Sequence, residues 1–233
     1  AQRLGMKNSS FRNAAGMPDP QHYTTASDLA KLTSALIRDF PAEYAKYYSI
    51  KEFRYNKITQ PNRNRLLWLD PTVDGVKTGH TDAAGYCLIS SAKRGPRRLL
   101  SIVLGTASDA VRAQESLKLL NYGFQFYDAV QLYAKNQPVS SLKVWKGAQG
   151  TVKAGFANDF MIAVPKGFEQ RIAVELASQQ PLMAPVTQGQ TIGTLKISLD
   201  GKPYGEYPVT AIETVPVASI FGRMIDSVRL WFN

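Results

Sequence analysis

The residues with the clearest chemical potential in this sequence are Lys77, Thr78 and Gly79, which follow the apolar Val76 within residues 74–85 (DGVKTGHTDAAG). An ammonium, a hydroxyl and a residue without a Cβ in succession are typical of an exposed strand that holds an anionic substrate. Charged donors bind carboxylates strongly, and a glycine lets a second backbone approach. Alternate residues of a strand face opposite ways, so Lys77 and Gly79 share one face unless the strand end twists. The competing interpretation is a turn that contains an incidental lysine.

Two arginines precede this strand, Arg63 and Arg65, both in the polar loop 60–65. A guanidinium can fork onto a carboxylate with two parallel hydrogen bonds. Either arginine is therefore a candidate second cation for the same anion, and a solvated loop arginine is the alternative.

The composition predicts a folded protein with a substantial core, because 44% of its 233 residues are hydrophobic and 10% are aromatic. The formal charge of +10 and the pI of about 9.7 indicate an anionic partner. The densest basic cluster is residues 93–98 (KRGPRR), which has Gly-Pro in its middle and apolar strands on either side. We therefore expect a solvated hairpin tip there, and no nucleic-acid partner.

The cysteine and histidine residues of the sequence do not indicate a metal site or a redox site. Cys87 is the single cysteine, and it stands in an apolar run that predicts a buried thiol. The two histidines, His22 and His80, have no carboxylates at the spacing of a metal site. We expect no metal and no cofactor.

The first half of the chain predicts an α+β domain. Residues 1–6 read as the last turn of a helix that ends at Gly5, and residues 8–25 read as a loop. Two core-facing helices are expected, one capped by Ser27-Asp28 and ended by Pro41, the other starting at Ser108-Asp109. Strands are expected at 49–59, around Lys77, and in a hairpin formed by 86–93 and 98–104, so the sheet should be antiparallel.

The second half changes character near Asp128. Short apolar or alternating runs are separated by turn residues about every ten positions, which predicts an all-β sandwich or small barrel. After Pro216, a possible helix carries Ile220, Phe221, Met224, Ile225, Val228, Trp231 and Phe232 on one face and Arg223, Asp226, Ser227 and Arg229 on the other. Such a helix can lie in a membrane interface, and packing on the β domain is the alternative. The expected domains are residues 1–128, 129–217 and 218–233.

Several runs of the sequence together resemble one known family. They are residues 4–6 (LGM), 16–18 (GMP), 22–26 (HYTTA), 28–30 (DLA), 62–64 (NRN), 73–81 (VDGVKTGHT) and 84–86 (AGY), with Phe11 and Leu67. They resemble the low-molecular-mass penicillin-binding proteins that are D-alanyl-D-alanine carboxypeptidases, and the β-rich half with its amphipathic tail is similar to the type-5 group.

The resemblance implies a fold and an activity. It implies part of a serine transpeptidase/β-lactamase-like domain, an antiparallel sheet with helices, followed by an all-β sandwich-like domain and an amphipathic helix. It implies a periplasmic enzyme, peripheral on the inner membrane through the C-terminal helix at an anionic surface. Such enzymes remove the terminal D-alanine from peptidoglycan pentapeptides through an acyl-enzyme serine, which β-lactam antibiotics such as penicillins also acylate.

The resemblance also assigns site residues. Lys77 supplies positive charge beside the nucleophile, Thr78 donates to the substrate carboxylate, and Gly79 belongs to the strand edge that pairs with the substrate backbone. The backbone N–H of His80 is an oxyanion donor, and Arg63 reaches the same carboxylate.

The sequence departs from the family in its nucleophile motifs. S-x-x-K occurs only at Ser90–Lys93 and Ser140–Lys143, both in strand-like runs, where residues three apart face opposite sides, and S-x-N does not occur. We therefore expect an N-terminal fragment to supply the catalytic serine, and this chain to be inactive alone. The alternative is a non-catalytic cell-wall-binding or scaffold module with a membrane-surface helix.

Overall fold

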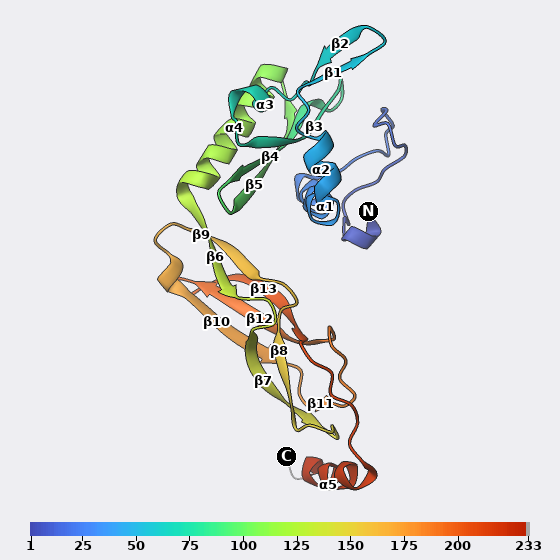
Figure 1. The fold of residues 1–233 in the computed structure, drawn as a ribbon, viewed down its shortest axis with the longest axis vertical. Helices are drawn as coiled ribbons and strands as arrows, with labels where there is room; N and C mark the ends of the chain where they lie inside the picture. The colour runs from blue at the N-terminus through green and yellow to red at the C-terminus, as the bar shows by residue number, and fades with distance from the viewer. Residues whose placement is uncertain (232–233) are drawn as a thin grey trace. The chain divides into compact units, whose positions relative to one another are not determined.

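The computed structural model of the chain describes residues 1–231, with the side chains of residues 1–230. The chain divides into two compact units, Ala1–Phe126 and Tyr127–Asn233. Each unit has its own sheet and its own buried core (Figure 1). The domain limits expected after residues 128 and 217 stay a prediction.

The centre of the first unit is a three-stranded antiparallel sheet in the order β3-β4-β5. Its strands are β3 (Val73–Thr81), β4 (Gly85–Arg94) and β5 (Arg97–Thr106). The predicted strand around Lys77 and the predicted hairpin across Gly95-Pro96 are thus confirmed. Because β3 lies at one end of this order, its outer edge has no strand partner among the described residues.

Helix α4 (Asp109–Phe126) packs on this sheet and completes its core. Ser108 caps it, as expected, because the Ser108 Oγ accepts a hydrogen bond from the Val111 N–H at 3.2 Å. The apolar residues of the core come from α4, from the sheet and from a short helix at residues 66–69: Leu66, Leu67, Val73, Leu88, Ala92, Ala113, Leu120 and Phe124. The predicted core-facing stripe of this helix is therefore confirmed.

Helix α1 (Ala26–Asp39) differs from its prediction in cap and in burial. The cap is Thr25, whose side chain accepts a hydrogen bond from the Asp28 N–H, so the prediction of Ser27-Asp28 was wrong by two residues. The predicted apolar face is only partly covered, since Leu32 is 39% exposed and Phe40 is 55% exposed. This face borders a cavity.

Asp28 does not cap the helix but accepts hydrogen bonds from residues of the preceding loop and of α1. Its buried carboxylate accepts hydrogen bonds from Lys31 Nζ at 2.9 Å and from the Asn8 N–H and the Ser9 Oγ, both at 2.8 Å. The Lys31 bond, helped by Ser9 and Asn8, holds the pKa of the Asp28 carboxyl below its usual value. These contacts tie the start of the long loop 8–25 to α1.

Residues 41–61 form a helix and a two-stranded hairpin, whereas a single strand was expected at 49–59. Pro41 ends α1 and also begins helix α2 (Pro41–Tyr47), because proline is tolerated in the first turn of a helix. The predicted strand 49–59 is a hairpin of β1 (Glu52–Tyr55) and β2 (Ile58–Pro61). Its turn residues Asn56 and Lys57 have φ of 46° and 63°, the left-handed conformation that a two-residue hairpin turn needs. The remaining short helices of this unit are η1 (Gln2–Leu4), followed by Gly5 at φ 71° as expected, and α3 (Leu66–Leu69).

The expected solvated basic tip is also corrected. Arg94 pairs with Asp70 at 2.8 Å, and Arg98 pairs with Asp74 at 2.7 Å. Their side chains are only 35% and 27% exposed. The charges of this cluster therefore fasten the hairpin to Asp70, just before β3, and to Asp74, at the start of β3.

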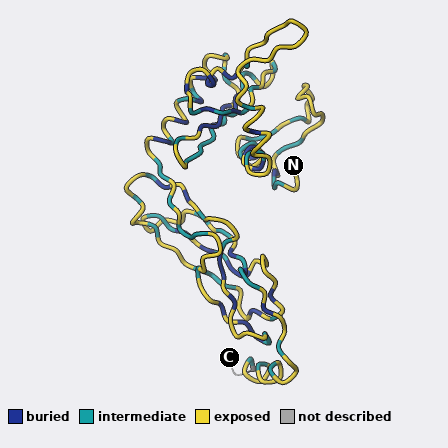
Figure 2. Tube along the Cα trace, viewed as in Figure 1, coloured by how far each residue is buried: buried dark blue, intermediate teal, exposed yellow. Residues whose placement is uncertain are grey.

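The second unit is built of strands, as predicted from its alternating runs. One sheet has the order β10-β12-β13-β8-β7-β11, and a second pairs β6 with β9. The strands are β6 (Tyr127–Tyr133), β7 (Pro138–Trp145), β8 (Thr151–Gly155), β9 (Phe160–Pro165), β10 (Ile172–Ser178), β11 (Leu182–Met183), β12 (Thr191–Leu199) and β13 (Lys202–Ala211), with a short helix η2 (Glu169–Arg171). The trace in Figure 2 is coloured as buried mainly along the strands of this unit.

Helix α5 (Ile220–Trp231) ends the described chain. It is shorter than the predicted 218–233, and Phe232, the side chain of Trp231 and any role for them lie outside the described residues. Within the described part of the chain, no helix combines the length and the apolar character needed to cross a membrane.

Candidate active site

The exposed part of β3 carries the predicted site residues. Lys77, Gly79 and His80 are exposed and Thr78 is half-buried. The Lys77 Nζ donates to the Thr78 carbonyl at 2.5 Å, so the ammonium lies along its own strand, where an incoming anion can compete for it. The centroids of the His80 and Tyr86 rings are 4.0 Å apart.

The start of β3 is clamped from two sides. Asp74 accepts a hydrogen bond from the Tyr44 hydroxyl at 2.9 Å and pairs with Arg98. The Asn64 side-chain amide, itself buried, donates to the Gly75 carbonyl at 2.9 Å. A Cβ at Gly75 would collide with the Tyr44 hydroxyl, so only glycine fits here.

Burial raises the pKa of the Tyr44 hydroxyl, which keeps this side chain neutral, so that it can donate its proton to Asp74 in a hydrogen bond. Lys77 therefore projects from a rigid base.

One cavity of about 1870 Å³ in the first unit brings the site residues together. Residues 76–80 of β3 form one wall, with Arg63 and Arg65 nearby. Leu29, Leu32 and Leu36 of α1 form an apolar wall. All five predicted site residues (Arg63, Lys77, Thr78, Gly79 and His80) line this cavity, and their catalytic or binding roles stay predictions.

Arg112 is the residue that sequence reasoning missed. It is only 4% exposed, yet it lines the cavity. Its guanidinium donates to the carbonyls of Gly79 at 3.4 Å and Arg63 at 3.3 Å, and lies 5.5 Å from the centre of the Tyr86 ring. It thereby joins the K-T-G strand to the Asn62-Arg63-Asn64 loop. The signal in the sequence was weak, because Arg112 stands directly before Ala113 of the predicted apolar stripe and so borders the core-facing side of the helix.

Arg65 makes fewer contacts with its surroundings than Arg112 does. It forms an exposed ion pair with Asp109, with 3.6 Å between the Arg65 Nη1 and the Asp109 Oδ2. Such a pair contributes little to stability.

The two S-x-x-K serines lie in strands, as predicted. Ser90 is fully buried on β4, whereas Lys93 is exposed. Ser140 is on β7, and the Lys143 ammonium lies 3.6 Å from the centre of the Trp145 ring. Neither serine lines the cavity formed by the described residues.

Metal ligands do not gather in the described residues, where no group of three or more His, Cys, Asp or Glu side chains is placed to hold an ion. Cys87 is half-buried rather than buried, with its Sγ 3.4 Å from the Ala84 carbonyl. The expectation of a fully buried thiol was wrong, because the end of β4 at Cys87 borders an exposed turn.

Comparison with known proteins matches both parts of the chain. The peptidase S11 family model, described as D-alanyl-D-alanine carboxypeptidase, matches residues 1–108. The model of the penicillin-binding protein 5 C-terminal domain matches residues 127–217.

Individual relatives agree with these matches. D-alanyl-D-alanine carboxypeptidase DacC of Escherichia coli K12 is 40% identical over 235 residues, which are 100% of this chain and 58% of that protein. DacA of Haemophilus influenzae is 40% identical over 97% of this chain and 58% of its own length. The crystal structure of penicillin-binding protein 5 from Haemophilus influenzae superposes with a TM-score of 0.80 at 38% identity, covering 92% of this chain and 63% of that one.

The chain thus spans somewhat under two thirds of the length of these relatives. The order of the two family models is the order of the two units, and the K-T-G strand falls inside the first match. This chain therefore belongs to the D-alanyl-D-alanine carboxypeptidase family of penicillin-binding proteins, of the type-5 group.

Proposed function

We propose that this chain forms the substrate-carboxylate side of a serine-type D-alanyl-D-alanine carboxypeptidase of peptidoglycan maturation. The observation that supports it best is the open edge of β3, where Lys77, Thr78 and Gly79 line a cavity together with Arg63 and Arg112. A peptide can pair with such an edge while its terminal carboxylate meets cationic and hydroxyl donors.

Each residue has a proposed role in this groove. Lys77 supplies positive charge beside the reacting carbonyl, and the Thr78 hydroxyl donates to the terminal carboxylate. Arg63 approaches the same carboxylate, while the buried Arg112 holds the two segments that carry Arg63 and Gly79 in place and adds positive potential. The His80 N–H is the proposed oxyanion donor.

The proposed reaction needs a serine that this groove does not contain within the described residues. A serine hydroxyl oxygen bonds to the carbonyl carbon of the penultimate D-alanine, the amide C–N bond breaks, and the terminal D-alanine leaves with the serine proton. Water then hydrolyses the ester and regenerates the hydroxyl. We propose that an N-terminal fragment supplies this serine and that a penicillin, acting as a β-lactam analogue of the peptide, acylates it; the relatives' name, penicillin-binding protein, supports this.

Labelling with a fluorescent penicillin tests this proposal against the scaffold alternative, which is favoured because no serine is among the described residues that line the groove. We expect the 233-residue chain alone to remain unlabelled, and a complex with an N-terminal fragment of a relative to be labelled on the fragment. The absence of label in a folded complex would favour the non-catalytic module. Stable label on Ser90 or Ser140 would contradict the strand assignments of both serines.

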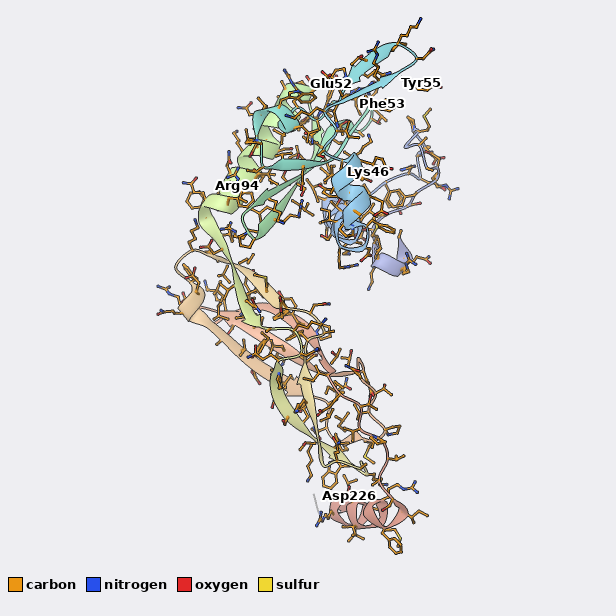
Figure 3. The ribbon with its side chains drawn as sticks, in the orientation of Figure 1. Lys46, Glu52, Phe53, Tyr55, Arg94 and Asp226 are labelled. Atoms are coloured by element: carbon orange, nitrogen blue, oxygen red, sulfur yellow. The ribbon has the colours of Figure 1, made fainter. Side chains whose placement is uncertain are left out.

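We infer a periplasmic location, peripheral on the inner membrane, with α5 as the membrane contact. Phe221 is 80% exposed, and Ile220, Met224, Ile225 and Val228 are each more than half exposed. The side of α5 that is partly covered carries Asp226, whose carboxylate accepts the Lys146 N–H at 2.7 Å (Figure 3). The helix therefore turns a polar residue towards the β domain and its apolar face to the surroundings, the arrangement of an interfacial helix.

Binding to anionic lipid vesicles measures this contact. The variant Phe221→Ser/Met224→Ser should bind at least about tenfold more weakly, because burying each large apolar side chain contributes about 1.5–3 kcal/mol. Ser227→Ala, which leaves the apolar face intact, is the matched control. Unchanged co-sedimentation of the double variant would place the contact elsewhere on the basic surface.

A further inference from the structure

The β1–β2 hairpin is exposed on both faces. All eight of its strand residues are exposed (Figure 2), so it adds no residue to the core of its unit. Phe53 is 63% exposed, Tyr55 is 75% exposed and Ile58 is 59% exposed. Large apolar side chains that gather on a surface without serving a core are typical of a binding site.

These three side chains share one face. Tyr55 lies opposite Ile58 and Phe53 lies opposite Gln60, and side chains directly across an antiparallel pair point the same way. The other face carries Arg54 opposite Thr59 and Glu52 opposite Pro61. Figure 3 shows Phe53 and Tyr55 on the projecting hairpin. The hairpin thus has an aromatic face and a polar face.

The hairpin is fastened to the candidate groove by a chain of hydrogen bonds. The Asn62 N–H donates to the Lys51 carbonyl at 2.6 Å, and its side-chain amide donates to the Ile50 carbonyl at 2.9 Å. The Asn62 Oδ1 accepts the Asn64 N–H at 2.9 Å, and Asn64 in turn holds Gly75 of β3. Pro61 and Asn62 at the base of the hairpin line the cavity itself. The base of the hairpin is therefore fixed to the wall of the groove, and the side chains of the aromatic face lie beyond the residues that line the cavity.

We propose that the face formed by Phe53, Tyr55 and Ile58 binds the sugar chain to which the stem peptide of peptidoglycan is attached. This inference rests on the proposed function, because the peptide in the groove is then covalently joined to sugars that continue beyond it. Sugar rings present faces of C–H bonds, which pack on the electron-rich faces of aromatic rings, while the Tyr55 hydroxyl and the Gln60 amide can bond to sugar hydroxyls and acetamido groups.

The charges of the hairpin agree with this partner. Lys51, Arg54 and Lys57 outnumber the single carboxylate, Glu52, in residues 51–60. Peptidoglycan carries free carboxylates on its stem peptides, so the net positive charge of the hairpin, with Arg54 on its polar face, favours this polymer over a neutral one.

Calorimetry on the full chain with two ligands tests the proposal. One ligand is the pentapeptide that ends in D-Ala-D-Ala, and the other is the same pentapeptide attached to its disaccharide. We expect the disaccharide ligand to bind about tenfold more tightly, and the variant Phe53→Thr/Tyr55→Thr to remove this difference while the affinity for the free peptide is unchanged. Threonine keeps the β-propensity of the strand.

The matched control is Arg54→Thr/Thr59→Ser on the opposite face, which should retain the tenfold preference. Equal affinities of the parent chain for the two ligands would overturn the sugar site but leave the peptide groove standing. If neither ligand binds, the groove proposal fails and this inference fails with it. A double aromatic variant that weakens both ligands equally, or that changes only the oligomeric state of the chain, would also overturn the sugar site.

Discussion

Replacing Lys77 by alanine should lower the rate of acylation by penicillin at least about 100-fold in an enzyme assembled with the serine-bearing fragment. Losing one preorganised electrostatic contact in a transition state has effects of this size. Lys77 is exposed on the open edge of β3, its ammonium is bonded only to a carbonyl of its own strand among the described residues, and Asp74 and Gly75 behind it are clamped. Stopped-flow acylation with a fluorescent penicillin gives the rate directly.

Lys93→Ala is the matched control for this experiment. Lys93 is also an exposed lysine of the same sheet, on β4, but it does not line the cavity. Its replacement should leave the rate within about twofold, since exposed substitutions away from a site have small effects. If Lys77→Ala and Lys93→Ala behave alike, Lys77 does not belong to the active site.

Replacing Arg112 by methionine should lower the free energy of unfolding of the chain by about 2–4 kcal/mol. Methionine fills a similar volume but removes the charged donor that bonds to the carbonyls of Gly79 and Arg63, and a hydrogen bond to a charged group contributes about 1.5–3 kcal/mol. Urea unfolding followed by tryptophan fluorescence measures this loss.

Arg65→Met provides the comparison for Arg112. Arg65 is a neighbouring arginine of the same cavity, but its side chain is 58% exposed and its ion pair with Asp109 is long. We expect its loss to cost less than about 1 kcal/mol. Arg112→Lys should fall between the two, because one ammonium keeps the charge but cannot span both carbonyls. Equal stabilities of the Arg112→Met and Arg65→Met variants would show that Arg112 does not join the two segments.

Among these experiments, the Arg112 variants separate stability from chemistry. A variant that unfolds more easily but acylates at the normal rate under native conditions would limit Arg112 to positioning β3. A drop in affinity for a peptide with a free C-terminal carboxylate, compared with its C-terminal amide, would instead show that its charge reaches the ligand.

The sequence alone predicted the elements that depend on neighbouring residues. The alternation around Lys77, the Gly-Pro hairpin, the stripe of α4 and the strands of the second unit are all periodic patterns, and side-chain burial repeats with the period of the element. The resemblance to the carboxypeptidases rested on short motifs and its type-5 part on the β-rich half with the amphipathic tail, and the matches to residues 1–108 and 127–217 confirm the family.

The tertiary structure decided what depends on residues far apart in the chain. Arg112 is 49 residues from Arg63 and 33 from Gly79, so its contacts leave no periodic signal in the sequence. The same holds for Asp28 with Asn8, for Arg98 with Asp74 and for the tie from Asp226 to Lys146. A hydrogen bond or ion pair needs two groups brought within about 3 Å of each other. Local residue types can supply the groups, but only the folded backbone brings them together.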